Sequence, residues 1–294
     1  MSDTAPDLPP RPVQTGDDRA GEDWAGAAGA RWLAHLDRFE GMIAPVGVAL
    51  LARAALSPGE RVLDVGCGGG ATTLAAARAV DPGGAAVGLD ISPDLVRRAR
   101  ERAAGAGAVE AVFVCADAAT VRPDAAPFDR MISRFGSMFF PDPRSAFAHL
   151  RSLLRPGGRL DLAVWAAPGD NLWMAAMVEI VRRHVDLPRP EPPAPGPFAF
   201  EDCDYLGEIL SASGFSEVEF QAWTGDLPFG GPGATPAEAV AFALEGMSFR
   251  EQVAALVPEA AERLSRDLLD LYLDRHTADG IMMPAKAWLV SART

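Results

Sequence analysis

The sequence contains little of what secreted, membrane-spanning or metal-binding proteins depend on. Only three cysteines, Cys67, Cys115 and Cys203, occur among 294 residues, and neither their odd number nor their spacing is typical of a disulfide framework or a metal site. No uninterrupted apolar stretch reaches about 18 residues, the length that a membrane-spanning helix needs. The first 14 residues are rich in Pro and Asp and lack the apolar core of a signal peptide. We therefore expect a cytoplasmic protein with no membrane contact and no bound metal.

Basic residues are also few relative to acidic ones, which gives a formal net charge of −13. Nucleic acids are bound through basic surface, and the chain has no Lys/Arg-rich run. Its densest basic cluster falls on one predicted helix together with Glu101, where a solvated helix face is the favoured interpretation; it comprises Arg97, Arg98, Arg100 and Arg102. A nucleic-acid partner is therefore disfavoured, and the sequence leaves monomer and homodimer open.

What the chain does contain is enough apolar material for one large α/β domain with insertions, since 49% of its residues are hydrophobic. Residues 1–21 are expected to be a disordered leader, because they contain many prolines and little to bury. Residues 22–56 show two helical patterns and are expected to form an N-terminal helical cap. Residues 57–294 form the main predicted domain, with insertions at about 170–200, which includes a Pro-rich loop at 187–200, and at about 224–280.

Strand and helix patterns alternate through the first half of this domain. Short apolar strands are predicted at 61–65, 85–89, 109–114, 128–132 and 159–165. Helices are predicted between them, two of which begin at a capping residue followed by proline, at Ser92 and Asp142. Further strands are predicted at 215–223 and 287–292. This alternation predicts a mainly parallel sheet with right-handed crossovers.

The most informative segment is the run Asp64-Val65-Gly66-Cys67-Gly68-Gly69-Gly70, at a predicted strand-to-helix turn. Glycines there let the backbone approach a ligand closely, and the following helix presents free N–H groups to an anion. Asp90 ends the second predicted strand, where a carboxylate can accept hydrogen bonds from a ribose diol. Asp117 closes the third strand, within reach of an adenine edge.

Two adenosyl cofactors compete for this arrangement. Gly66-x-Gly68-x-x-Ala71 also matches the dinucleotide fingerprint, so an NAD(P)-dependent oxidoreductase is the alternative. Asp64 opposes it, because a carboxylate there would repel a pyrophosphate but attract the α-ammonium of a methionyl group. No Tyr/Lys pair supports a dehydrogenase either, since the only lysine is Lys286. The residues favour S-adenosylmethionine (SAM) over NAD.

Four ordered motifs, D-V-G-C-G-G-G, G-L-D-I-S, C-A-D-A and L-R-P-G-G-R-L, resemble those of class I SAM-dependent methyltransferases over about residues 57–165. The resemblance implies a Rossmann-like, mostly parallel seven-stranded sheet with helices on both faces and an antiparallel last strand at 287–292. It also implies cofactor-binding roles. The methionyl part would lie against Asp64, Gly66, Cys67, Gly68 and Gly70, the ribose on Asp90, the adenine on Ile91, Asp117 and Ala118, and the sulfonium beside Ser133 and Arg134.

The flanking segments W-A-G-A-A-G-A-R-W, S-R-F-G-S-M-F-F-P-D-P and G-P-F-A-F are similar to ubiquinone/menaquinone-type and secondary-metabolite methyltransferases. The sequence departs from the amino-methyltransferases of nucleic acids, whose fourth motif is an Asn/Asp-Pro-Pro-aromatic run, because it has Ser133-Arg134-Phe135-Gly136 there. A small-molecule acceptor is therefore expected.

Large apolar residues cluster in segments outside the predicted sheet core or at its carboxyl edge, where binding sites of α/β sheets lie. They predict an apolar, aromatic-accepting substrate pocket lined by Trp32, Met138, Phe139, Trp165, Trp173 and Phe198. No catalytic residue follows from the sequence; His35 and His184 are candidate general bases, although a surface or structural role is favoured for both. A SAM-binding sensor without catalysis, or a non-methylating SAM-dependent enzyme, stays open as an alternative.

Overall fold

The computed structural model describes residues 22–187 and 194–294. The leader expected at 1–21 and residues 188–193 of the Pro-rich loop lie outside the described residues.

Within this part of the chain the strands form one mixed sheet, in the order β3-β2-β1-β4-β5-β8-β6, with β7 paired to β8. Strands β1 to β5 pair in parallel, whereas β8 is antiparallel to both β5 and β6. The strands are β1 (Arg61–Val65), β2 (Ala85–Asp90), β3 (Ala111–Cys115), β4 (Phe128–Arg134), β5 (Leu154–Trp165), β6 (Ser216–Phe229), β7 (His276–Thr277) and β8 (Gly280–Arg293).

This arrangement confirms the predicted Rossmann-like fold with its antiparallel last strand, and it differs from the prediction in detail. The sheet has eight strands rather than seven because β7 adds a two-residue edge to β8. Strand β5 begins at Leu154 rather than at residue 159, with a register shift against β4. Strands β6 and β8 extend past the ends predicted for them because they pair with each other as far as Phe229 and Ile281. The segment between these strands is therefore 230–279, and residues 224–229 belong to the sheet.

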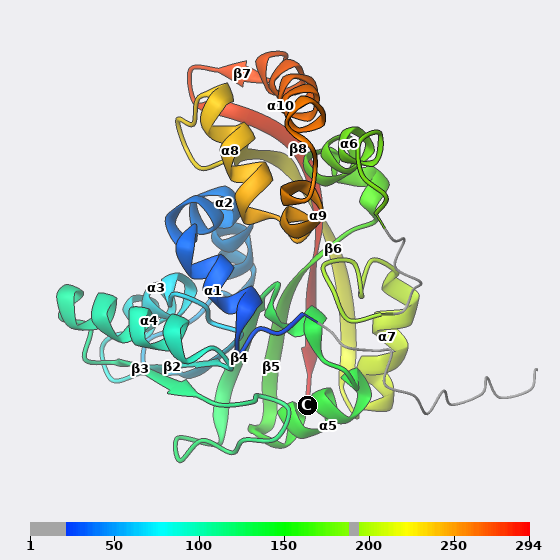
Figure 1. Cartoon of the computed structure of the whole chain (residues 1–294). Helices are drawn as coiled ribbons and strands as arrows, with labels where there is room; N and C mark the ends of the chain where they lie inside the picture. Colours follow the sequence, from blue (N-terminus) through cyan, green and yellow to red (C-terminus); the bar gives the residue numbers. More distant parts are fainter. Residues whose placement is uncertain (1–21, 188–193) are drawn as a thin grey trace, which may run out of the picture.

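Helices cover both faces of the sheet (Figure 1). On one face lie α3 (Ala71–Val80) and α4 (Pro93–Ala106), beside the N-terminal helices α1 (Ala27–Ala34) and α2 (Leu36–Ala54). On the other face α5 (Pro143–Ser152) and α7 (Cys203–Ala212) contact each other and pack on β5 and β6. Short 3₁₀ turns follow β4 and β5, at η1 (Gly136–Phe139) and η2 (Pro168–Asp170).

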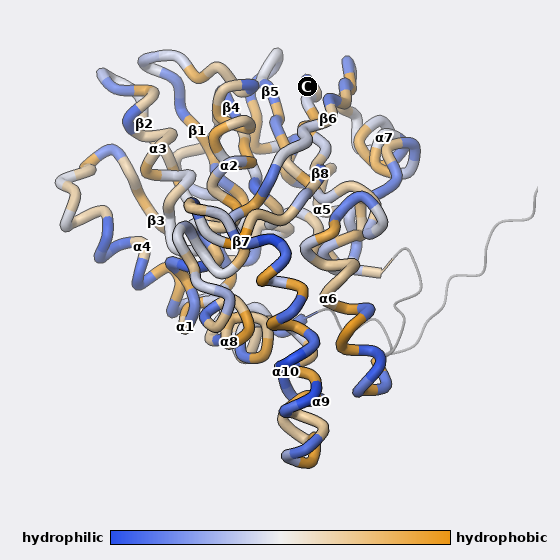
Figure 2. The backbone as a smooth tube through the Cα atoms, turned by 90° about the horizontal axis from the view of Figure 1, so that it is seen from above, coloured by the Kyte–Doolittle hydropathy of each residue, from blue (hydrophilic) through white to orange (hydrophobic). Residues whose placement is uncertain are grey.

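The remaining helices gather above one end of the sheet, at the top of Figure 1. They are α6 (Leu172–Arg182), α8 (Pro236–Gly246), α9 (Arg250–Ala254) and α10 (Pro258–Leu273). Helix α10 buries Leu264, Leu268 and Tyr272, which are spaced four residues apart on one face, and Figure 2 shows it alternating between hydrophilic and hydrophobic positions. None of the described helices combines the length and apolarity that crossing a membrane requires.

The two helix starts predicted from local sequence are confirmed by their caps. The Ser92 hydroxyl accepts a hydrogen bond from the Leu95 amide at 3.4 Å, and the Asp142 carboxylate accepts one from the Ser145 amide at 3.1 Å. In each case proline occupies the first helical position, where its missing N–H costs nothing. These caps fix where α4 and α5 leave the carboxyl edge of the sheet.

Candidate functional site

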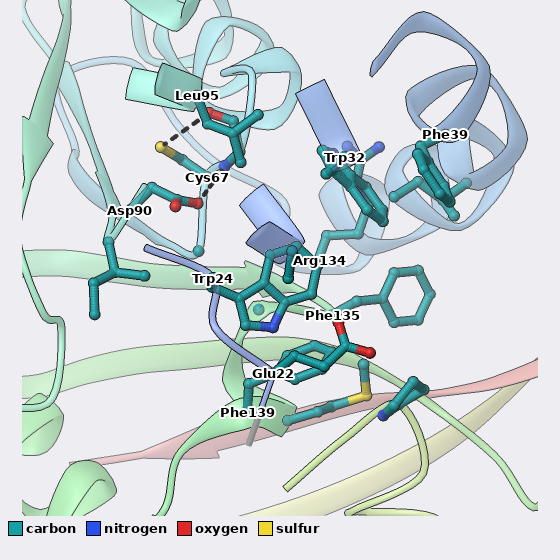
Figure 3. Close-up of a pocket in the computed structure, with 18 of the residues that line it drawn as sticks. Glu22, Trp24, Trp32, Phe39, Cys67, Asp90, Leu95, Arg134, Phe135 and Phe139 are labelled. Atoms are coloured by element: carbon teal, nitrogen blue, oxygen red, sulfur yellow. Dashed lines mark hydrogen bonds between the residues drawn. The ribbon is translucent and has the colours of Figure 1, made fainter. Parts of the chain in front are cut away.

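A cavity of about 440 Å³ lies at the carboxyl ends of the parallel strands, between the sheet and the helices above it (Figure 3). That volume falls within the range of roughly 300–1,000 Å³ found for ligand sites. Its floor comes from the turns after β1, β2, β3 and β4. Its roof comes from the segment 22–28, from α1 and α2, and from residues 246–248 after α8.

The turn after β1 brings bare backbone to the cavity. Gly66 has φ +71° and Gly68 has φ +54°, conformations that favour glycine. Gly66 also packs directly on Gly136, because a Cβ built on Gly66 would lie 2.6 Å from the Gly136 Cα. Two chain segments, the turn after β1 and the turn after β4, therefore meet here without side chains between them. Gly66, Cys67 and Gly68 all line the cavity, as the sequence predicts.

Asp90, at the end of β2, is held in place by backbone amides. Its two carboxylate oxygens accept hydrogen bonds from the Gly68 amide at 2.8 Å and the Ser92 amide at 2.9 Å. Burial raises the pKa of this carboxyl above its ordinary value. A carboxylate has about four lone-pair positions, so Asp90, which lines the cavity, can accept further hydrogen bonds from a ligand. This geometry fits a ribose diol.

Beside Asp90 the cavity is lined by Ile91, Asp117 and Ala118, the residues that the sequence assigns to adenine. Ile91 is 43% exposed, unusual for a large apolar residue at a strand end. One Asp117 oxygen accepts a hydrogen bond from the Ala119 amide at 2.8 Å and so closes its own turn. An apolar surface beside a fixed polar edge suits a planar heterocycle.

Asp64 does not reach the cavity, contrary to its predicted contact with an α-ammonium group. Its side chain is buried below the glycine turn, where it accepts a hydrogen bond from the Thr73 hydroxyl of α3 at 2.7 Å. Burial raises the pKa of this carboxyl to about 6. Successive side chains of a strand point to opposite faces of the sheet, so Val65 lines the cavity while Asp64 points away from it. Through Thr73, Asp64 ties the turn after β1 to α3.

Gly70 and Ser133 also lie behind the cavity wall rather than in it. The Ser133 hydroxyl donates a hydrogen bond to the Val65 carbonyl at 2.7 Å and accepts one from the Ser137 amide at 3.1 Å. Gly70 precedes α3 with φ +85°, and a Cβ on it would meet Phe113 and Ala99 at less than 3 Å. Both residues shape the turns that carry the cavity-lining residues.

Aromatic side chains form another part of the cavity lining, and one of them, Trp32, lies close to Gly68 of the glycine turn. Trp32 stacks on Phe39 with ring centroids 4.1 Å apart, and Trp24 meets Trp32 and Phe139 edge-on at 5.8 and 4.9 Å. Of the predicted pocket residues, those that line the cavity are Trp32, Met138, Phe139, Trp165 and Trp173. Phe198 packs against the core instead, and its neighbour Pro197 reaches the cavity.

Phe135 adopts a backbone conformation that is uncommon for a bulky residue, with φ +67°. Its amide donates a hydrogen bond to the Ala163 carbonyl at 2.9 Å, and its ring stacks on Trp165 with centroids 3.9 Å apart. The next residue, Gly136, is pressed against Gly66. The close approach of these two turns, together with the Trp165 stack, holds Phe135 in this strained state, which is typical of functional sites.

Several charged residues of the cavity were not predicted from the sequence. Glu22 pairs with Arg31 at 3.0 Å, and Glu40 pairs with Arg102 of α4 at 2.5 Å. Glu40 follows Phe39 on α2, but consecutive helical residues point in different directions, so no local pattern indicates it. Met247 and Ser248 line the cavity from a segment that is distant in the sequence, and no local sequence pattern identifies them as cavity residues.

Neither candidate histidine lines the cavity. His35 meets Phe39 and Phe242 edge-on and lies 3.9 Å from Glu245. The His184 ring is 2.8 Å from the Asp267 carboxylate, so it links the segment after α6 to α10, and it is not among the residues that line the cavity. Both placements match the structural roles that the sequence favoured for these residues.

Known proteins resemble this chain in both sequence and fold. A family model described as a methyltransferase domain matches residues 62–158. The nocamycin O-methyltransferase of Saccharothrix syringae is 33% identical over 183 residues, which cover 59% of this chain and 65% of that protein. An uncharacterised protein of Mycobacterium tuberculosis is 36% identical over 151 residues, which cover 51% of this chain and 54% of that protein. Each match thus spans less than two thirds of the relative's length.

The YcgJ protein of Bacillus subtilis superposes with a TM-score of 0.56 at 20% identity, over 85% of this chain and 98% of that one. At this level of identity the likeness concerns the fold. The sequence motifs resemble those of methyltransferases, the matching family model is that of a methyltransferase domain, and the fold is the Rossmann-like one that the motifs predict.

Proposed function

We propose that this chain, which carries a class I SAM-dependent methyltransferase domain with SAM as its cofactor, transfers the methyl group of SAM to O, N or C of a small metabolite. The acceptor that we propose is apolar and contains an aromatic ring. The observation that carries this proposal is the composition of one cavity. The glycine turn, Asp90 and Asp117 form its cofactor end, and Trp32, Phe139 and Trp165 line the same space.

The cofactor end can hold each part of an adenosyl ligand with residues already in position. Asp90 would accept hydrogen bonds from the ribose hydroxyls, and the turn at Gly66–Gly68 would lie along the methionyl part. Ile91 and Ala118 would pack on adenine, with Asp117 at its edge. When bound, SAM supplies an activated methyl carbon.

The chain's own contribution is to position the acceptor and keep water out. Trp24 contacts both Trp32 and Phe139, and all three line the cavity. Their flat, apolar surfaces would align an aromatic acceptor by stacking.

General-base catalysis has little support at this site. No histidine is among the described residues that line the cavity, and the Glu22 and Glu40 carboxylates are held by Arg31 and Arg102. The reaction that we propose therefore depends on in-line positioning. It best suits an acceptor that is already nucleophilic at neutral pH, such as a carboxylate, an acidic phenol or an amine.

Two observations favour this function over its alternatives. A SAM sensor would be expected to have a helix that plugs the path from the cofactor end, whereas the cavity here continues from Gly66 to Trp173. A dinucleotide enzyme would bind a negatively charged pyrophosphate at the turn after β1. The buried Asp64 carboxylate adds negative charge there and would repel it. The name of the nocamycin O-methyltransferase supports an oxygen acceptor and a place in secondary metabolism.

The test begins with isothermal titration of the full chain with SAM, S-adenosylhomocysteine (SAH) and NADH. Binding of SAM and SAH without NADH is expected, and binding of NADH alone would refute the proposal. Aromatic carboxylic acids, phenols, quinols and amines are then incubated with SAM, and formation of SAH and methylated product is followed by mass spectrometry. Product formation with wild type but not with Asp90→Asn is the expected result, and no product from any class would favour the sensor.

A further inference from the structure

Arg134 is a cation inside the cavity that has no hydrogen-bond or salt-bridge partner among the described residues. It ends β4, and its side chain lies among the residues that line the cavity (Figure 3). Across residues 22–187 and 194–294, no hydrogen bond or salt bridge reaches its guanidinium, although a guanidinium carries five N–H donors. By contrast, Arg31, the other arginine of the cavity lining, is paired with Glu22 at 3.0 Å.

The fold makes room for this guanidinium at one position of α2. A Cβ built on Gly47 would lie 2.7 Å from Nη1 and 3.2 Å from Cδ of Arg134. Gly47 is buried in the middle of a 19-residue helix, where glycine is less favourable than alanine. One of the two glycines of α2 thus lies where the arginine packs, and a larger residue there would contact the Arg134 side chain.

The acidic groups around Arg134 are committed elsewhere. Glu40 and Asp64 are close enough to interact with it electrostatically. However, the Glu40 carboxylate is bound to Arg102 at 2.5 Å, and the Asp64 carboxylate accepts its hydrogen bond from Thr73. Burial lowers the pKa of the Arg134 guanidinium below its ordinary value. Arg134 is half-buried, and a partly desolvated cation without a hydrogen-bonded anion is unfavourable, so its N–H donors favour an anionic ligand group in the cavity.

We propose that Arg134 binds a carboxylate of a ligand in the cavity. A guanidinium and a carboxylate match in shape and charge and commonly form paired hydrogen bonds. This inference rests on the proposed function and adds to it the chemistry of one ligand group. The carboxylate belongs either to the methionyl part of the cofactor or to the acceptor. In the second case the enzyme acts on an aromatic acid rather than on a neutral ring.

The first arm of the test asks whether the cofactor supplies the carboxylate. SAH and 5′-methylthioadenosine, which lacks the amino-acid part, are titrated into wild type, Arg134→Gln and the control Arg97→Gln, which alters an exposed arginine of α4. If the cofactor is the source, Arg134→Gln weakens SAH roughly 10- to 150-fold, the range expected for a hydrogen bond to a charged group. The affinity for 5′-methylthioadenosine is then unchanged.

The second arm asks whether the acceptor supplies it. The SAH-saturated protein is titrated with 1-naphthoate and with the neutral 1-naphthamide. If the acceptor is the source, naphthoate binds more tightly than naphthamide to wild type, and Arg134→Gln removes the difference while SAH binds normally. Gly47→Ala, which presses a methyl group on the intact guanidinium, is expected to shift the same affinity in the same direction.

The inference is overturned if Arg134→Gln leaves SAH affinity unchanged and naphthoate binds no better than naphthamide to wild type. It is also overturned if SAH and 5′-methylthioadenosine weaken equally, because that result indicates general damage to the site. Thermal unfolding of each variant identifies such damage independently. Failure of wild type to bind either adenosyl ligand would instead refute the proposed function, so the two failures are distinguishable.

Discussion

The buried carboxyl of Asp64 makes the stability of the protein depend on pH in a calculable way. Its pKa is 3.8 in an unfolded chain and about 6 in the folded one, because burial disfavours the charged form. The folded state therefore binds more protons between these values, and stability falls as pH rises through this window. One pKa unit corresponds to about 1.36 kcal/mol, so the whole shift is worth about 3 kcal/mol. Roughly 2 kcal/mol of it falls between pH 4.5 and 7.5.

Replacing Asp64 with Asn removes the titrating group and keeps an oxygen that can accept the Thr73 hydrogen bond. Urea unfolding of wild type and Asp64→Asn across pH 4.5 to 7.5 measures the difference in free energy of unfolding. We expect that difference to shift by about 2 kcal/mol in favour of the variant as pH rises. Asp94→Asn, which changes a half-exposed carboxylate of α4, is the matched control.

The expected result concerns the slope, because the new amide can add a cost that does not depend on pH. A difference between wild type and Asp64→Asn that stays constant over the whole range would refute the reasoning. It would mean that Asp64 is ionised in the folded protein as readily as in the unfolded chain.

Three further predictions follow from the cavity itself. Asp90→Asn places an amide where the carboxylate accepts from Gly68 and Ser92, so titration calorimetry should show SAH and 5′-methylthioadenosine both weakened by about 1.5–3 kcal/mol; unchanged affinities would contradict the ribose role. Gly136→Ala presses a Cβ to 2.7 Å from the Gly66 backbone and should lower stability by about 1–3 kcal/mol, so an unaltered Tm would contradict it. Four of the six tryptophans line the cavity, so SAH should change the tryptophan fluorescence, and Trp32→Phe should reduce that change; equal signals would count against a ligand beside Trp32.

Local chemistry explains why parts of this fold could be predicted from the sequence. The starts of α4 and α5 depend on Ser92 and Asp142, each of which caps an amide only three residues away. The glycine turn after β1 likewise needs its unusual backbone angles whatever surrounds it. Strand ends were less predictable, because β6 and β8 extend each other through pairing between distant segments.

The candidate site likewise contains residues that the sequence predicts and residues whose place depends on tertiary packing. Gly66, Gly68 and Asp90 could be placed at the cavity because parallel strands bring their carboxyl ends to one edge. Asp64 lies at the predicted strand end but is not among the residues that line the cavity, since its direction depends on how β1 and α3 pack. His184 was a candidate base only because the sequence could not show that Asp267 of α10 would face it.

The sequence by itself determined the type of domain, and it predicted the glycine turn and the Asp90 carboxylate that line the cavity. The glycine turn depends on backbone geometry within a few residues, whereas the domain type and the place of Asp90 depend on parallel strands that end at one edge of the sheet. Only the tertiary structure decided how the cavity closes, because its walls come from segments as distant as Glu22 and Ser248. It also decided that Arg31 is paired whereas Arg134 has no salt-bridge partner in the described part of the chain, since a side chain's charge partners depend on which elements are packed around it.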